Sequence, residues 1–286
     1  MTDAPFDIRA TIARLFVYPV KSCAGVEVGE AVLTDAGLDL DRAWMVVDAQ
    51  GTFVSQRELP RMALVKPQLK HHEVILRAPG MLALHLSIDA VEEPAKVRVW
   101  DDEVPAYDMG NLAAQWFSDF LGQKLRLVRF DPDHRRLSNL KWTGGVEAPN
   151  QFSDGYPLLV LSEASLAGLN ERLVAAGQAA VGIERFRPNI VLAGLEAHDE
   201  DRLGPLSVDA GGPVRLQPVK PCPRCPIPDI DPATAERGTA VTDALARYRS
   251  DERVDGALSF GMNAIVLEGD GQVLKVGQAV TGDWLF

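Results

Sequence analysis

The chain has 286 residues, of which 47% are hydrophobic and 24% are charged, a composition that excludes wholesale disorder. Its formal net charge of −11 argues against nucleic acid and anionic membranes as partners, so any bound anion needs a local basic pocket. No apolar run reaches the roughly 20 residues of a membrane helix. The N-terminus has no signal-peptide stretch, so we expect a cytoplasmic protein with no membrane partner.

The first half of the chain is expected to consist mainly of short strands. Apolar, β-branched runs alternate with Gly, Pro and acidic turns, which indicates a barrel or a sandwich. The expected strands are Thr11–Tyr18, Ala43–Asp48, Val74–Arg77, Leu82–Ile88, Lys96–Trp100 and Arg126–Phe130. A helix is expected over Asn111–Leu121, with an apolar face that holds Leu112, Trp116, Phe117 and Phe120. These elements predict a β-barrel-like domain over residues 8–130.

A polar segment over residues 131–153, with two prolines and two glycines, separates the halves. Domain boundaries fall in such linkers. Because this linker is long for a loop without a function, we expect part of it to cover a site.

The second half, residues 154–286, is expected to form another β-rich domain with a few helices. Ser162 should cap a helix that follows an apolar strand. The stretch Val214–Pro232 contains six prolines and cannot be a helix interior. A hairpin is expected around Glu268-Gly269-Asp270-Gly271. The other expected elements are strands at Leu158–Leu161, Phe186–Leu192, Asn263–Leu267 and Gln272–Val276 and a helix at Thr242–Tyr248. The fold class is therefore β-rich α+β.

The three cysteines are too few for a disulfide framework, but two of them form the motif Cys222-Pro223-Arg224-Cys225. A thioredoxin-type dithiol needs a helix that starts at the first cysteine, and Pro226 and Pro228 oppose such a helix. A zinc site needs four ligands, and neither Cys23 nor the five histidines show ligand spacing.

A third reading of the pair is a single thiolate ligand for a soft metal. Lys220 and Arg224 would favour the thiolate electrostatically, and the Pro-rich loop would hold its sulfur in place. This chemistry does not choose the metal. Two buried thiols without a function remain the alternative.

Basic residues stand beside several of the expected strands of this acidic chain. Lys21 and Ser22 follow the first strand, where they could offer an ammonium and a hydroxyl to a phosphate. Arg42 begins another strand. Arg187 precedes Pro188, so its backbone is expected to be extended. Together these residues could form an anion clamp, but periodicity cannot show that they converge.

Motifs in a fixed order, from about Ile12 to Val280, give the chain a resemblance to a known family. They are YPVKSC at 18–23, DRAWMV at 41–46, RFRPNI at 185–190, KPCPRC at 220–225, DPAT at 231–234, SFG at 259–261 and KVG at 275–277. The sequence resembles the MOSC family with its N-terminal β-barrel domain. It is similar to the amidoxime-reducing branch and to bacterial molybdenum-dependent N-hydroxyl reductases, which implies a barrel-like domain followed by a MOSC β-barrel domain.

The resemblance implies molybdenum cofactor, a pterin dithiolene (molybdopterin) with a terminal phosphate. A soft thiolate suits molybdenum, and cationic and hydroxyl groups suit the phosphate. The resemblance implies that Cys225, rather than Cys222, is the metal ligand. It also implies that Asp154 is an acidic residue near the metal or pterin. The cofactor contacts that it implies are Lys21, Ser22, Arg42 and Arg187.

The sequence departs from the family pattern after the ligand cysteine. Pro226-Ile227-Pro228-Asp229 stands where the reductases usually carry Ile-Leu-Thr-Thr, so we expect a stiffer loop and a charge from Asp229 near the metal. Ala235 stands where the family often has glycine. The chain has no iron–sulfur ligand set, so electrons are expected from a separate reductase or a ferredoxin-type protein.

Three functions follow from the resemblance. The first is an oxidoreductase that reduces small N-hydroxylated or N-oxide compounds, with the cofactor carrying the chemistry. The second is a sulfur carrier for cofactor sulfuration, with a persulfide on Cys225 and a pyridoxal-phosphate-dependent partner. The third is a non-catalytic cofactor carrier. A persulfide on Cys225 without molybdenum would distinguish the second function from the first.

Overall fold

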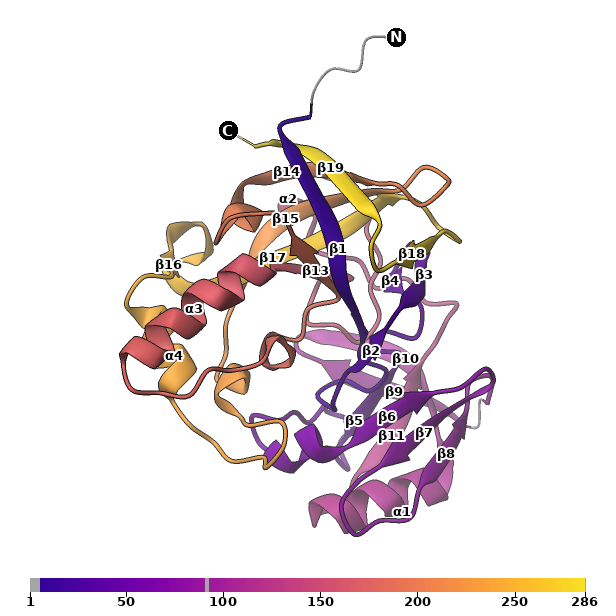
Figure 1. Cartoon of the computed structure of the whole chain (residues 1–286). Coiled ribbons are helices and arrows are strands. Elements are labelled where there is room, and N and C mark those ends of the chain that lie inside the picture. The colour runs from indigo at the N-terminus through magenta and orange to yellow at the C-terminus, as the bar shows by residue number, and fades with distance from the viewer. Residues whose placement is uncertain (1–5, 91–92, 286) are drawn as a thin grey trace.

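The computed structural model describes residues 6–90 and 93–285 and contains a closed barrel of seven strands (Figure 1). In order around the barrel, the strands are β12 (Leu158–Ser162), β13 (Ile190–Ala193), β1 (Ile8–Val17), β19 (Ala279–Trp284), β14 (Leu203–Val208), β15 (Arg215–Pro223) and β17 (Ala257–Glu268). Strand β17 pairs with β12 and closes the barrel. Neighbouring strands are antiparallel except β12 and β13, which are parallel.

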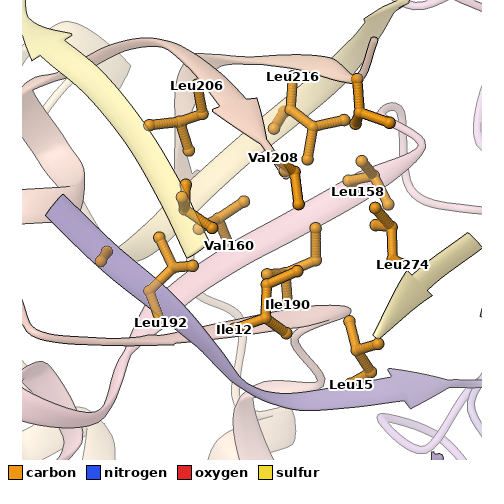
Figure 2. Close-up of a cluster of buried hydrophobic side chains, with 14 of the residues drawn as sticks. Ile12, Leu15, Leu158, Val160, Ile190, Leu192, Leu206, Val208, Leu216 and Leu274 are labelled. Atoms are coloured by element: carbon orange, nitrogen blue, oxygen red, sulfur yellow. The ribbon is translucent and has the colours of Figure 1, made fainter. Parts of the chain in front are cut away.

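The barrel interior is filled by apolar side chains from alternate positions of these strands (Figure 2). In β1, Ile8, Ala10 and Ile12 are buried while Arg9 and Thr11 are exposed, as the two-residue period of a strand requires. Burial of each large aliphatic side chain contributes about 1.5–3 kcal/mol, so this layer is a main source of stability. The interior includes Val160, Leu192, Leu206, Val208 and Leu216.

Strand β1 links the two halves of the chain, because it pairs with both β13 and β19. The first ten residues of the domain expected over 8–130 therefore lie in the barrel of the second half. The apolar pattern of a strand sets its buried face but does not identify its partner. The first five residues, part of the N-terminal segment used to judge targeting, and Phe286 lie outside the described residues.

Among its described residues, the rest of the N-terminal half includes two sheets formed entirely by its own strands and the α-helix α1. One sheet has the order β5 (Trp44–Val47), β11 (Arg126–Phe130), β10 (Asp102–Asp108) and β9 (Pro94–Val99). The other has the order β6 (Lys66–Leu69), β7 (Glu73–Arg77) and β8 (Leu84–Ser87). Helix α1 (Gly110–Leu121) buries Trp116, Phe117 and Phe120. Leu112 was wrongly expected on that face: it is 76% exposed, because it lies roughly 100° around the helix from buried Ala113.

The described residues contain three other α-helices, so the expectation of a β-rich α+β fold is confirmed. They are α2 (Leu140–Thr143), α3 (Glu163–Ala175) and α4 (Ala240–Ala246). Ser162 caps α3 as expected, because its side chain accepts a hydrogen bond from the Ser165 N–H. Helices α3 and α4 lie against one side of the barrel (Figure 1). Within the described part of the chain, no helix is both long and apolar enough to cross a membrane.

The expectation of a hairpin around residues 268–271 is wrong. The two strands on either side of this turn pair with other strands. Strand β18 (Val273–Lys275) pairs with β3 (Glu30–Thr34), and β3 also pairs with β4 (Gly37–Leu38). Strand β17 pairs with β12, with β15 and with the short β16 (Ser250–Asp251). Gly269 and Gly271 have φ angles of 122° and 78° and turn the chain away from β17. The remaining short strand, β2 (Val26–Val28), pairs with β1.

Candidate cofactor site

One pocket brings together all six residues that the sequence singled out as a site. We call it the inner pocket. The six residues come from stretches far apart in the chain, and several other side chains join them. The predicted residues that line the pocket are Lys21, Ser22, Arg42, Asp154, Arg187 and Cys225. Periodicity could not show this convergence, because it depends on how the strands are paired.

Three of these residues have left-handed backbone conformations. The φ angles are 64° for Ser22, 53° for Arg42 and 58° for Arg187. Such a conformation costs a non-glycine residue about 1–2 kcal/mol and persists only where its surroundings hold it, often at functional sites. The expectation of an extended Arg187 is wrong, because its N–H closes a turn onto the Glu184 carbonyl before Pro188.

The guanidinium groups of Arg42 and Arg187 both pack on the ring of Tyr18. Their central carbons lie 4.4 and 4.3 Å from the ring centre. Arg42 is ion-paired with Asp41 and donates a hydrogen bond to the Arg187 carbonyl (3.1 Å). Arg187 donates to the Cys23 carbonyl (2.6 Å) and forms no ion pair with a described residue. Burial and the nearby Arg42 charge lower the pKa of Arg187, so an anion bound here would stabilise its charged form.

Lys21 places a buried ammonium beside the pocket. Its Nζ atom donates to the Phe152 carbonyl (2.8 Å) and is ion-paired with Asp154. Burial lowers the pKa of Lys21, and Asp154 opposes that shift. Desolvation by the surrounding chain acts against ionisation of Asp154, although 67% of its side chain is exposed, and the Lys21 ammonium holds the pKa of that carboxyl well below its usual range. Asp154 also accepts a hydrogen bond from the Trp100 indole (3.3 Å), so its charged carboxylate is fixed in place.

The cysteine loop follows directly from barrel strand β15. Cys222 lies in the strand, and Cys225 lies two residues beyond the end of the strand. Arg224 anchors the loop by donating to the main-chain carbonyls of Phe260 (2.9 Å) and Phe186 (2.9 Å). No helix starts at Cys222, so the dithiol reading lacks the dipole it needs. Burial raises the pKa of the Cys222 thiol.

The zinc reading also lacks support in the structure. Residues 6–90 and 93–285 contain no group of three or more His, Cys, Asp or Glu side chains arranged to hold a metal ion. A metal held by one protein sulfur, with its other ligands supplied by a cofactor, does not require such a group.

Asp229 does not bring its charge to the pocket, so that expectation is wrong. Its side chain is buried and accepts hydrogen bonds from the Val241 N–H (2.8 Å) and the Thr242 hydroxyl (2.6 Å) at the start of α4. The short 3-10 turn Ile227–Asp229 instead directs the carboxylate to the first N–H groups of the helix, which have no partner within the helix. Ala235, where the family often has glycine, has a φ of 63°, a conformation that favours glycine.

Sequence reasoning missed several side chains of the inner pocket, of which Asn189 makes the most direct contact with a predicted residue. Asn189 accepts from the Arg42 guanidinium (3.1 Å) and from the Leu159 N–H (3.1 Å), so it holds Arg42 against β12. Its place in the RFRPNI motif was the available signal. Arg57 and Tyr156 also line the pocket, but no local pattern marked them.

The segment over residues 131–153 lies beside the site, as expected of a long linker. Its buried Arg136 donates to the carbonyls of Gln151 (2.9 Å) and Ser153 (2.8 Å), and thereby holds the chain that leads to Asp154. The segment thus helps to position the carboxylate that pairs with Lys21.

Comparison with known proteins identifies the family. A match to the MOSC N-terminal beta barrel domain covers residues 9–124, and a match to the MOSC domain covers residues 147–281. The chain belongs to the MOSC family. This MOSC protein is 36% identical over 285 residues to human mitochondrial amidoxime-reducing component 1, a match that covers 94% of the chain and 82% of the human protein.

Two further relatives show the range of the family. Rat mitochondrial amidoxime reducing component 2 is 35% identical over 235 residues, which are 78% of this chain and 68% of the rat protein. Bovine molybdenum cofactor sulfurase is 30% identical over 261 residues, which are 85% of this chain but 29% of the sulfurase. The MOSC protein therefore spans less than a third of the sulfurase.

The donor set of the inner pocket fits molybdenum cofactor. A phosphate needs cationic and hydroxyl groups, which Lys21, Ser22 and Arg187 provide. Arg187 lacks an acidic partner among the described residues, so a bound anion would compensate its positive charge. A soft metal needs a sulfur ligand, which Cys225 provides at the pocket wall.

Proposed function

We propose that this MOSC protein is a molybdenum-cofactor-dependent oxidoreductase that reduces N-hydroxylated or N-oxide compounds. The observation that carries the proposal is the convergence of Cys225, Lys21, Ser22, Arg42, Arg187 and Asp154 on one pocket. The names of the relatives support the same reaction class, since two of them are amidoxime-reducing components. When bound, the cofactor would supply the two-electron chemistry that a protein side chain cannot.

Different side chains of the pocket would bind different parts of the cofactor. Lys21, Ser22 and Arg187 would hold the phosphate, and Asn189 and Asp41 keep Arg42 aimed at the same pocket. Cys225 would hold the metal, on a loop that Arg224 fixes to the barrel. Asp154 stays ionised beside Lys21, so it would act as a fixed negative charge rather than as a proton donor.

The overall reaction needs two electrons and two protons for each N–OH group. The N–O bond breaks, an N–H bond forms, and the oxygen leaves as water. We propose that a separate reductase or ferredoxin-type protein delivers the electrons, since the chain has three cysteines and no iron–sulfur ligand set.

Metal and pterin analysis tests the proposal directly. We expect near one molybdenum and one pterin per chain after expression in a host that makes the cofactor. Cys225→Ser should abolish reduction of benzamidoxime with an added reductase, whereas the matched Cys222→Ser should keep both the metal and the activity. Absence of molybdenum and pterin from the wild type, under conditions that load a known relative, would overturn the proposal, and so would the reverse pattern in the two variants.

A sulfur-carrier role is the second candidate, and the similarity to molybdenum cofactor sulfurase favours it. Cys225 would then carry a persulfide supplied by a pyridoxal-phosphate-dependent partner. Mass spectrometry of the purified chain separates the two functions. A mass increase of one sulfur on Cys225, without bound molybdenum, would support the sulfur carrier over the reductase.

A further inference from the structure

A second cavity of about 670 Å³ adjoins the inner pocket, within the size range of pockets that bind small organic molecules. We call it the outer cavity. Cys225, Asp154 and Tyr156 line both spaces. Lys21, Ser22, Arg42 and Arg187 line only the inner pocket, whereas the outer cavity adds Trp100, Asp101, Asp102, Arg136 and Lys220. Of the two spaces, the cationic and hydroxyl side chains of the cofactor site thus face only the inner pocket, whereas Cys225 stands at the wall that both spaces share.

Trp100 forms one wall of the outer cavity, and its backbone and ring are both held by their surroundings. It stands in the turn between β9 and β10 with a φ of 55°, which is rare for so large a side chain. Its ring packs against Phe53, with ring centres 4.9 Å apart, and under the Arg57 guanidinium at 4.6 Å. Even so, Trp100 remains 42% exposed, so part of its ring is free to contact a bound molecule.

Tyr156 provides a second aromatic side chain. Its hydroxyl is buried and has no hydrogen-bond partner among the residues that the structure describes. Buried polar groups are normally paired, so this unpaired hydroxyl would be stabilised by a bound group that the Tyr156 ring turns to meet. Burial raises the pKa of Tyr156 to about 12, which keeps the group protonated and able to donate.

The charges around the outer cavity leave a surplus of positive charge. Asp102 is paired with Arg136 (2.7 Å), and Asp154 is paired with Lys21. Lys220 lies 5.2 Å from the Trp142 ring centre and 5.9 Å from that of Tyr156, and it forms no ion pair with any described residue. The complete charged lining is Arg57, Arg136, Lys220 and Arg224 against Asp101, Asp102 and Asp154. A cationic surplus is unusual in a chain with a net charge of −11.

We propose that the outer cavity is the substrate site and that it selects flat aromatic N-hydroxylated compounds that carry an anionic substituent. The aromatic ring packs on Trp100, the anion pairs with Lys220, and the Tyr156 hydroxyl donates to a polar atom of the substrate. The N–O bond then points toward the wall that contains Cys225. This assignment rests on the proposed reductase function and names the substrate class of that same site.

Steady-state kinetics of the holoenzyme tests the role of Lys220. The substrates are benzamidoxime, which is neutral, and 4-carboxybenzamidoxime, which carries one negative charge. We expect the wild type to have about a tenfold lower KM for the carboxylated compound, the ratio that one well-placed ion pair of about 1.4 kcal/mol gives. Lys220→Gln should remove this preference by raising the KM for the carboxylated compound about tenfold relative to the KM for benzamidoxime. Lys124→Gln, which removes an exposed lysine that lines neither space, should retain it.

The same assay tests Trp100 with an aliphatic comparison. Trp100→Leu should raise the KM for both aromatic amidoximes about tenfold relative to the KM for acetamidoxime. Trp284 provides the matched control, since Arg202 packs over its ring at 4.8 Å but it lines neither space. Equal KM values for neutral and carboxylated substrates in the wild type would overturn the proposal. An equal effect of Lys220→Gln on both substrates would also overturn it.

Calorimetric titration separates this proposal from the reductase function. If the wild type holds the cofactor but reduces no amidoxime, the reductase proposal fails. Binding of 4-carboxybenzamidoxime that is at least fivefold weaker in Lys220→Gln than in Lys124→Gln would still support the anion-selective cavity. No binding, or equal binding by the two variants, would overturn it.

Discussion

The ammonium of Lys21 is ion-paired with the carboxylate of Asp154, although the two residues are 133 positions apart in the sequence. The pair joins the chain just after β1 to the chain just before β12. Lys21 is only 5% exposed, so its charge depends on Asp154 and on the Phe152 carbonyl for compensation. The carboxylate itself is more accessible, with 67% of its side chain exposed, so solvent screens part of the interaction.

Replacing Asp154 with Asn should therefore lower the free energy of unfolding by about 1–2 kcal/mol at pH 7. The folded-state pKa of Asp154 lies below its usual value, so the pair contributes its full stability above about pH 4. That contribution is lost as the pH falls through the lower folded-state pKa. Thermal unfolding at pH 7, 5 and 3 should show the gap between wild type and Asp154→Asn shrinking at pH 3. A gap that stays constant over this range would mean that the pair does not stabilise the fold.

Cofactor retention should depend on Arg187. Arg187→Met keeps most of the packing on Tyr18 but removes the cation, so bound molybdenum and pterin should fall about tenfold while the circular dichroism spectrum is unchanged. Arg14→Met is the matched control, because Arg14 also packs on an aromatic ring (Phe16, 4.7 Å) but lines neither space. Full occupancy in Arg187→Met would refute its contact with the anionic cofactor.

Ala235→Gly should stabilise the protein. The left-handed backbone at Ala235 costs about 1–2 kcal/mol, while glycine loses more chain entropy on folding, so the expected net gain is about 0.5–1 kcal/mol. Urea unfolding measures the change. Ala233→Gly, nearby and without a positive φ, should instead destabilise the protein, and the same loss at both positions would argue against strain at Ala235.

Local patterns predicted local structure well. The strand expected at Arg126–Phe130 has those bounds in the structure, and the Ser162 cap forms as expected, because both depend on neighbouring residues. The motifs also named six residues that line one pocket. Their convergence follows from the pairing of β1 with β13 in the barrel, which brings the chain after β1 close to the chain before β13.

Features that depend on distant contacts could not be read from the sequence. The partner of β18 is β3, which precedes it by about 240 residues, and no turn signal encodes such a pairing. Arg57 and Trp100 belong to separate loops and acquire a common role only where their side chains stack. The proline that follows Arg187 favoured an extended backbone, but the turn onto Glu184 prevailed.

Asp229 provides a test of whether the unusual loop after Cys225 acts on the fold or on the metal. Asp229 accepts hydrogen bonds from the backbone N–H groups of Val241 and Thr242, so Asp229→Ala should leave donors at the start of α4 unsatisfied. The expected loss of stability is about 1–2 kcal/mol, as for removal of a helix cap, with no change in bound molybdenum. Asp209→Ala, at an exposed carboxylate, should change neither quantity. Loss of molybdenum from folded Asp229→Ala would show that this carboxylate acts on the cofactor site as well as on α4.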